Sequence, residues 1–252
     1  MYPPESPFPV YCHDCWVSDK WNPIDYGRDY DFNKTFFKQF KELQKKVPRL
    51  NLYQRNSQNS SYTNMAGESK NVYLGYSIVS SEDVLYSKNV DYSSGIMDSL
   101  AVVNSEQCYE NAYAEKNYNT HFVEHASHCI DSWFLYACVN CKNCAMSSNL
   151  INKEFVFRNE QCTKEEYLEK VKNLNLSSFS GVSKAMEDFK GIKQKAIRRY
   201  ATIIQATNAT GDNVLHAKNA HVCFDSYEIE NVKYGCRIFK SKDSMDASYT
   251  AI

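Results

Sequence analysis

The sequence predicts a mainly β protein built as a parallel β-helix, and two interleaved repeats support this prediction. Between Asn71 and Asn119 a small apolar residue recurs every six positions, at Val72, Ile78, Val84, Val90, Ile96, Val102, Cys108 and Ala114. Midway between these stand small polar residues or glycine, at Gly75, Ser81, Ser87, Ser93, Ser99, Ser105, Asn111 and Asn117. Such a short period is typical of stacked coils with apolar side chains inside and small residues at the corners.

Composition agrees with this fold class and disfavours one class of function, nucleic-acid binding. Asn, Ser and Tyr (19 residues) are abundant while Leu is scarce, which suits short strands better than a helical bundle. The net charge of -1, from 29 basic and 30 acidic residues, disfavours a nucleic-acid partner, because such a partner requires a basic excess. Neither a signal segment nor a run of eighteen apolar residues occurs. We therefore expect a soluble cytoplasmic protein with no membrane contact, whose ten cysteines are reduced.

Residues 1–30 are expected to form a zinc-knuckle-like segment. Cys12 and Cys15 have the C-x-x-C spacing that places two thiolates on one side of a tetrahedral zinc ion. A structural zinc is therefore a candidate cofactor, and a reduced turn is the alternative, because no second cysteine pair lies nearby.

Residues 31–48 are expected to form a capping helix. Asp31 and Asn33 are candidate N-caps, and Pro48 ends the segment. The apolar stripe consists of Phe36, Phe37, Phe40, Leu43 and Val47. A repeat protein needs such a cap because its first coil otherwise exposes an apolar interior.

Residues 49–162 carry the hexads of the solenoid. Three hexads make an eighteen-residue coil, in which Val72, Val90 and Cys108 would stack in adjacent coils; the handedness is left open. After Ala126 the apolar position moves by three residues, which predicts an inserted half-hexad or a bulge.

Residues 163–207 are expected to be a helical insertion. Thr163 and Glu166 form a capping box, and a longer helix is predicted from Ser183 to Ala206. Its apolar face holds Met186, Phe189, Ala196, Tyr200 and Ile203. The hexad returns at Val214, so residues 208–252 are expected to continue the solenoid on the earlier coils.

Three sets of residues suggest chemistry. Cys138, Cys141 and Cys144 follow the half-hexad spacing, which favours interior packing over zinc or iron–sulfur ligation. Asp98, Asp131 and Asp225 each precede a serine, which is typical of turns. Surface carboxylates in a β-helix could alternatively serve a carbohydrate-active hydrolase or lyase.

The histidines offer a second enzymatic alternative. His121, His125 and His128 crowd one segment, and one of them could act as the base of a hexapeptide-type acyltransferase. The aliphatic-small signature of those enzymes is absent from the chain, and a strand would turn these side chains to different faces.

The sequence favours a non-enzymatic binding or scaffold protein over these enzymes. The residues predicted to bind a protein or glycan partner are outward-facing tyrosines: Tyr73, Tyr86, Tyr92, Tyr109 and Tyr113. Neither the partner nor the oligomeric state follows from the sequence.

Several segments together resemble an uncharacterised family of bacterial proteins: Phe8–Trp21, Asp25–Phe32, Phe36–Phe40, Lys164–Tyr167 and Gly211–Asn213. In that family a further C-x-x-C pair precedes this region and completes a zinc ribbon, followed by a Cys- and Asn-rich repeat region. Members are sometimes labelled CaiB/BaiF family proteins, a name that denotes a type of CoA-transferase. No residue pattern in this chain supports that label, and the resemblance implies no established activity.

Overall fold

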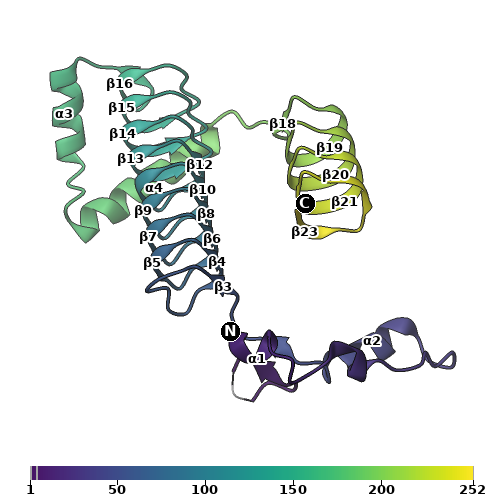
Figure 1. The fold of residues 1–252 in the computed structure, drawn as a ribbon. Coiled ribbons are helices and arrows are strands. Elements are labelled where there is room, and N and C mark those ends of the chain that lie inside the picture. Colours follow the sequence, from purple (N-terminus) through teal and green to yellow (C-terminus); the bar gives the residue numbers. More distant parts are fainter. Residues whose placement is uncertain (1, 4, 252) are drawn as a thin grey trace. The chain divides into compact units, whose positions relative to one another are not determined.

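A computed structural model describes residues 2–3 and 5–251 of the chain. The chain divides into two compact units, Met1–Ala196 and Ile197–Ile252. Most of the regular structure consists of short parallel strands stacked in long sheets (Figure 1). The predicted mainly β class with parallel strands is therefore confirmed.

The strands of the first unit form two columns. One column contains β5 (Lys70–Tyr73), β7 (Glu82–Leu85), β9 (Ser94–Met97) and β11 (Glu106–Tyr109). The other contains β3 (Gln54–Arg55), β4 (Asn64–Gly67), β6 (Tyr76–Val79), β8 (Lys88–Asp91), β10 (Leu100–Val103) and β12 (Ala112–Glu115). The longer β13 (Tyr118–Glu124) pairs with both columns. After it come β14 (Ile130–Tyr136), β15 (Lys142–Ser148), β16 (Glu154–Phe157) and the antiparallel β17 (Glu160–Gln161).

Each coil contains twelve residues, so the predicted coil of eighteen is wrong. Val72 pairs with Val84, and Val84 pairs with Ile96. Val90, which the longer coil would stack on Val72, lies in the other column and pairs with Ile78. Two hexads therefore close one coil, and successive apolar hexad positions belong to opposite sides of it.

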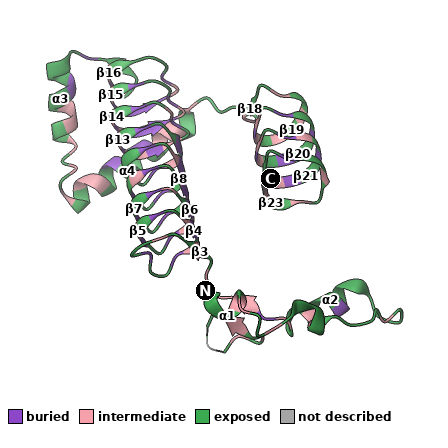
Figure 2. Cartoon of the chain, viewed as in Figure 1, coloured by how far each residue is buried: buried purple, intermediate pink, exposed green. Residues whose placement is uncertain are grey.

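The backbone turns at every third residue, so a coil of twelve residues has four corners. From Asn56 to Phe155 every third residue has a positive φ, between +47° and +62°. The residue after each such turn generally points into the coil, so buried positions recur every three residues along the stack (Figure 2). A left-handed conformation costs a non-glycine residue roughly 1–2 kcal/mol, and Asn and Asp tolerate it best. This preference accounts for residues such as Asn71 and Asp83 at the corners.

Hydrogen-bond ladders stabilise these corners. The Asn71 amide donates to the Asp83 carboxylate at 2.8 Å, one coil further on. Inside the coil, the Ser81 hydroxyl accepts from the Ser93 N–H at 3.1 Å and donates to the Val79 carbonyl at 2.8 Å. The small polar positions are therefore buried and satisfied, and they form part of the interior instead of lying at a solvent-facing corner.

The predicted register shift after Ala126 is not a shift of the backbone. His121 still pairs with Trp133, and Val123 with Leu135, at the unchanged spacing of twelve. The apolar residues move to the alternate inward position, which earlier coils fill with serine. No insertion or bulge is needed, because both positions face the interior.

The N-terminal segment contains β1 (Val10–Tyr11), α1 (His13–Trp16), the 3-10 helix η1 (Pro23–Tyr26), α2 (Phe36–Gln44) and β2 (Arg49–Leu50). Strands β1 and β2 pair in parallel. Helix α2 is shorter than the predicted 31–48, and its N-cap position is Thr35, whose side chain makes no capping hydrogen bond, and not Asp31 or Asn33. Its role as a cap on the solenoid stays a prediction.

Two helices follow the first solenoid. Helix α3 (Lys164–Asn173) begins with the predicted capping box of Thr163 and Glu166. Helix α4 (Phe179–Lys195) starts earlier and ends earlier than predicted. Ile203, which was expected on the helix, instead lies in a strand and pairs with Val214. Ile203, at the end of the predicted helix, therefore belongs to a parallel sheet and not to a helix.

The second unit is also a stack of parallel strands. It contains β18 (Ile203–Ile204), β19 (Thr207–Leu215), β20 (Lys218–Tyr227), β21 (Glu230–Phe239), β22 (Lys242–Met245) and β23 (Ser248–Ala251). Its hexad residues Val214, Ala220, Val232 and Ile238 are buried, as predicted. These strands form a sheet of their own, so the returning hexad does not add strands to the first sheet.

Candidate docking surface

The predicted catalytic aspartates occupy separate turns. Asp98 and Asp131 lie at different corners and almost three coils apart along the stack, while Asp225 belongs to the second unit. The Asp131 carboxylate accepts from the Asn119 amide at 2.8 Å, and Asp225 accepts from Asn213 at 2.8 Å. The serine after each aspartate is buried inside the coil. Asp-Ser is thus a corner and its inward neighbour, and within the first unit the geometry does not bring the Asp98 and Asp131 carboxylates together for acid–base chemistry.

The three histidines occupy different positions of one coil: His121 lies in β13, and His125 and His128 lie at two successive corners. His121 stacks on Trp133 with ring centroids 4.1 Å apart, and burial lowers its pKa. His125 stacks on Tyr113 at 4.9 Å, and His128 lies at the next, exposed corner. A shared catalytic or metal site does not form from these side chains.

Cys138, Cys141 and Cys144 are buried in the interior of the coils, beside Cys129. Hydrogen bonding from the three neighbouring thiols lowers the pKa of Cys141, while the same contacts and burial raise the pKa values of the other three. Interior packing, the favoured interpretation, matches their place in the apolar cluster.

Cys12 and Cys15 are both exposed, Cys12 at the N-cap of α1 and Cys15 within the helix. Hydrogen bonds from Cys15 lower the pKa of Cys12. Tetrahedral zinc requires four ligands, and these thiols supply two. Among residues 2–3 and 5–251 no three His, Cys, Asp or Glu side chains are arranged to hold a metal ion. Zinc binding at this pair stays a prediction that needs ligands from outside the pair.

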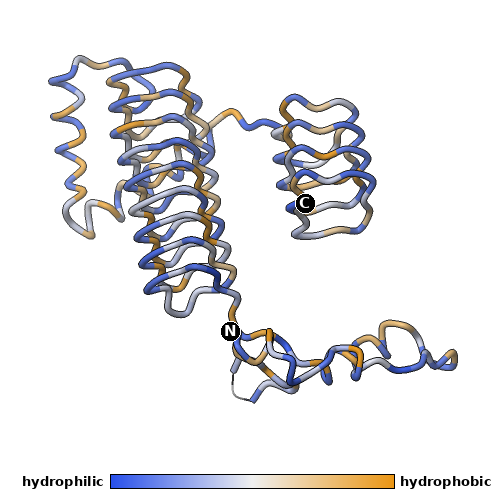
Figure 3. Tube along the Cα trace, in the orientation of Figure 1, coloured by the Kyte–Doolittle hydropathy of each residue, from blue (hydrophilic) through white to orange (hydrophobic). Residues whose placement is uncertain are grey.

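A column of outward residues on the first solenoid forms a more extensive feature. Strand pairing places in register Tyr73, Leu85, Met97, Tyr109, His121, Trp133, Ala145 and Phe157. The next residue of each coil forms a second column at the corner: Leu74, Tyr86, Asp98, Glu110, Phe122, Phe134, Met146 and Arg158. We call the two columns together the corner stripe. Figure 3 traces the hydropathy of the chain along these coils.

The half of the corner stripe from His121 to Arg158 is covered by the helices. Phe134, Ala145 and Met146 are fully buried in a cluster that includes Tyr167 of α3 and Phe189 of α4. The rings of Phe134 and Phe189 lie 5.6 Å apart, edge to face. We call this part the covered half.

Two ion pairs accompany this apolar contact. The Lys193 ammonium of α4 lies 2.8 Å from the Glu124 carboxylate, and Arg158 at the end of the stripe lies 2.7 Å from Asp188 of α4. The solenoid therefore binds α4 through apolar side chains and through charges of both signs.

The half from Tyr73 to Glu110 is exposed, and we call it the exposed half. Leu74 is 46% exposed and Tyr86 is 51% exposed, and Leu85 and Met97 are exposed beside them. The Tyr73 ring stands edge to face with Tyr86, at 5.8 Å and 85°. At the junction, the rings of Tyr109 and of Phe122 in the covered half lie edge to face, with their centroids 5.3 Å apart. The strand column is thus apolar or aromatic from Tyr73 to the junction, while Asp98 and Glu110 occupy the corner column beside it.

Three of the five predicted binding tyrosines lie on this stripe: Tyr73, Tyr86 and Tyr109. Tyr92 and Tyr113 lie at other corners of the coil. Sequence reasoning missed Leu74, Leu85 and Met97, because their alignment with the tyrosines is visible only at a period of twelve. Tyr92 borders a shallow hollow of about 450 Å³, in which Lys70 and Glu82 form an ion pair at 2.7 Å.

Comparisons with known proteins add little. No protein-family model matches the chain, and a search of curated proteins finds no match. A solved structure of a "putative acetyltransferase" from Desulfovibrio desulfuricans G20 is similar at 11% identity, covering 78% of this chain and 58% of that one. Its TM-score of 0.17 is too low to carry an argument about fold or activity. Among the described residues no helix is long and apolar enough to cross a membrane.

Proposed function

We propose that this chain is a non-enzymatic binding protein whose exposed half of the corner stripe docks a helix of a partner protein. The observation that carries the proposal is the continuity of the stripe: the same two columns that α3 and α4 cover in the covered half continue, uncovered, through four more coils. Tyr, Leu and Met are the residue types that protein interfaces use for adaptable apolar contact.

The ring geometry favours a protein partner over a glycan. Tyr62 and Tyr73 meet at 89°, and Tyr73 and Tyr86 meet at 85°. Rings that stand edge to face make a ridged surface and not the flat platform on which a sugar ring stacks. Ridges and the gaps between them suit the side chains of a helix.

A photo-crosslinking residue placed at Tyr86 in the native cell tests the proposal, with the same residue at Tyr92 as the matched control. Tyr92 is also exposed, at 63%, but lies at another corner. We expect a specific protein adduct at Tyr86 and not at Tyr92. The purified adduct protein should bind Tyr86→Ser at least about tenfold more weakly than wild type, which is the loss of a strong interface contact, and Tyr92→Ser unchanged. Equal binding to both variants would refute the docking surface.

A further inference from the structure

The exposed half lacks a cation that its acidic residues could use. Asp98 and Glu110 follow one another in the corner column, and burial together with the neighbouring Asp98 charge raises the pKa of Glu110. Within the described part of the chain neither carboxylate forms an ion pair. In the covered half, by contrast, the corner residue Arg158 meets Asp188 of α4, and Glu124 meets Lys193. A helix suited to the exposed half would present apolar side chains and a positive charge.

Helix α2 of this same chain has that chemistry. Phe36, Phe37 and Phe40 are 54%, 80% and 44% exposed on one side of the helix. Lys41 lies next to Phe37 on the helical wheel, at i+4, and has no ion pair among the residues that the structure describes. The segment that follows adds Lys45 and Lys46. The helix is therefore amphipathic and cationic, and its aromatic side is largely exposed among the residues that the structure describes.

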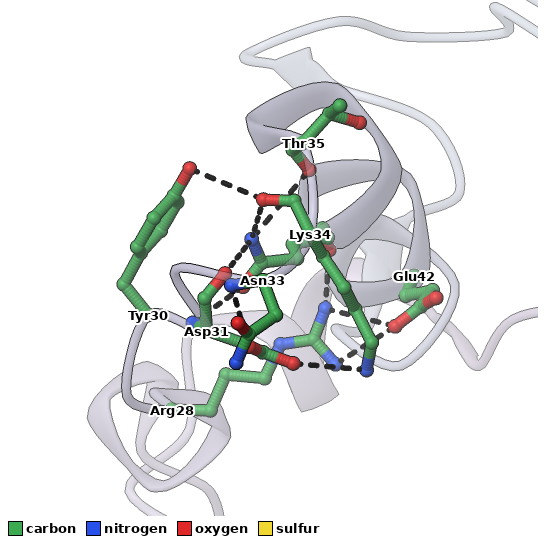
Figure 4. Close-up of polar contacts among 8 residues, drawn as sticks. Arg28, Tyr30, Asp31, Asn33, Lys34, Thr35 and Glu42 are labelled. Atoms are coloured by element: carbon green, nitrogen blue, oxygen red, sulfur yellow. Dashed lines mark hydrogen bonds and ion pairs between the residues drawn. The ribbon is translucent and has the colours of Figure 1, made fainter.

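The opposite side of α2 is held in place, so the aromatic side stays presented. Gln39 is the one buried residue of the helix. Its side chain accepts from the Asp31 N–H at 2.8 Å and donates to the carbonyls of Asp31 and Lys34 at 2.9 and 3.0 Å. Arg28 bonds the Gln39 carbonyl and pairs with Glu42 at 3.4 Å (Figure 4). Docking would thus require little ordering of the helix, which favours affinity.

We infer that the exposed half of the corner stripe binds helix α2 of a second copy of this chain. The inference rests on the proposed docking function and names its partner. Phe37 and Phe40 would pack on Leu74, Leu85 and Tyr86, and Lys41 would neutralise the carboxylates of Asp98 and Glu110. Each copy carries both surfaces, so reciprocal exchange between two copies satisfies both at once.

Sedimentation of the full-length chain over a concentration series tests this inference. Wild type is expected to self-associate with increasing concentration. Phe37→Ser and Tyr86→Ser should each weaken the association at least about tenfold. The matched controls Phe179→Ser and Tyr92→Ser remove residues that are as exposed, at 90% and 63%, and should leave it within about twofold. Unchanged circular dichroism melting would show that every variant is folded.

Mixing the two interface variants identifies the second copy as the source of the helix. Phe37→Ser retains an intact stripe and Tyr86→Ser retains an intact α2, so a mixture should form a heterodimer although neither variant self-associates at that concentration. A charge exchange gives a further check: Lys41→Glu and Glu110→Lys should each weaken association, and the two together should restore it.

Two results would overturn the inference. Wild type that sediments as a monomer at every soluble concentration excludes the second copy, as does an oligomer that Tyr86→Ser leaves intact. If a different protein crosslinks at Tyr86 and the monomeric chain binds it in a Tyr86-dependent way, the proposed function stands and only the identity of the partner is wrong. If wild type stays monomeric and no protein crosslinks specifically at Tyr86, both proposals are wrong.

Discussion

The covered and exposed halves of the corner stripe both present apolar side chains, but they differ in the charges of their corner column and in the residues inside their coils. Behind the exposed half, the alternate inward positions are Ser81, Ser93 and Ser105, each bonded to the next coil. Behind the covered half, the corresponding positions include Cys129, Leu135 and Cys141, which belong to an apolar cluster. The coils of the exposed half therefore combine a hydroxyl ladder with a buried apolar cluster that includes Val72, Val84 and Ile96, whereas apolar side chains and cysteines take most of the ladder positions in the covered half.

This difference indicates that the exposed half folds without a cover. Its hydroxyl ladder satisfies buried backbone groups coil by coil, so each coil needs only its neighbours. The covered half includes Phe134 and Met146, large side chains that point outward at the corner and are buried only because helices lie on them. A surface that is stable while uncovered can exchange partners, whereas one built around an intramolecular helix cannot.

Removal of the helix anchor is expected to have the largest effect. Phe189 is 6% exposed and contacts the fully buried Phe134, so Phe189→Ala should lower the free energy of unfolding of the first unit by about 3–5 kcal/mol. Phe37→Ala, at a residue that is 80% exposed, should change it by less than about 0.5 kcal/mol in dilute protein. Urea denaturation followed by circular dichroism measures both values. Equal losses of unfolding free energy for Phe189→Ala and Phe37→Ala would show that the packing of α4 on the covered half does not stabilise the first unit.

Breaking the hydroxyl ladder is expected to have an intermediate effect on the exposed half. The Ser93 hydroxyl accepts from the Ser105 N–H at 3.1 Å and donates to the Asp91 carbonyl at 2.8 Å. Ser93→Ala leaves a buried N–H unsatisfied and should cost about 1–3 kcal/mol in the same denaturation experiment. Ser93→Cys should cost less, because sulfur can still accept and cysteine occupies the equivalent positions Cys129 and Cys141.

The neighbouring Ser94→Ala is the matched control. Ser94 is half-buried, and its side chain makes no hydrogen bond among the described residues. If Ser94→Ala lowers the free energy of unfolding as much as Ser93→Ala does, the hydroxyl ladder does not stabilise the stacking of the coils.

The sequence predicted the inward ladder correctly because burial of Val72, Ile78 and Val84 depends only on a repeat of six. The coil length could not be read from that ladder, since every column repeats at six and therefore fits coils of twelve or eighteen. Pairs at i and i+12, such as Asn119 with Asp131, carried the missing information.

The error in coil length is also why the docking surface was predicted only in part. Tyr73 and Tyr86 were identified as outward residues, but their alignment with Leu85 on one corner follows from the coil of twelve. The cover over Phe134 comes from a helix far along the chain, and no local pattern shows where that helix packs.

Neutralising Glu110 of the exposed half and Glu124, which lies outside the stripe and pairs with α4, should have small effects of opposite sign. Glu124→Gln removes an ion pair with Lys193 whose partners are about one-third exposed, so the variant should be less stable than wild type at pH 7 by about 0.5–1 kcal/mol. Glu110→Gln removes a carboxylate that has no cation beside it, and it should raise the melting temperature by about 1 °C or less.

The pH dependence of the Glu110 effect follows from the direction of its pKa shift. Burial and the Asp98 charge raise the pKa of Glu110 in the folded state, so the folded chain holds this proton more tightly than the unfolded chain does. Stability is then lost as the pH rises from the ordinary carboxyl range through the raised pKa, and the glutamine variant avoids that loss. The gain should be present at pH 7 and disappear below about pH 4, the ordinary pKa of glutamate. Calorimetry at both pH values, in protein dilute enough to be monomeric, measures it. A melting temperature that falls at pH 7 would mean that Glu110 already has a stabilising partner and that the two halves of the stripe do not differ in charge pairing.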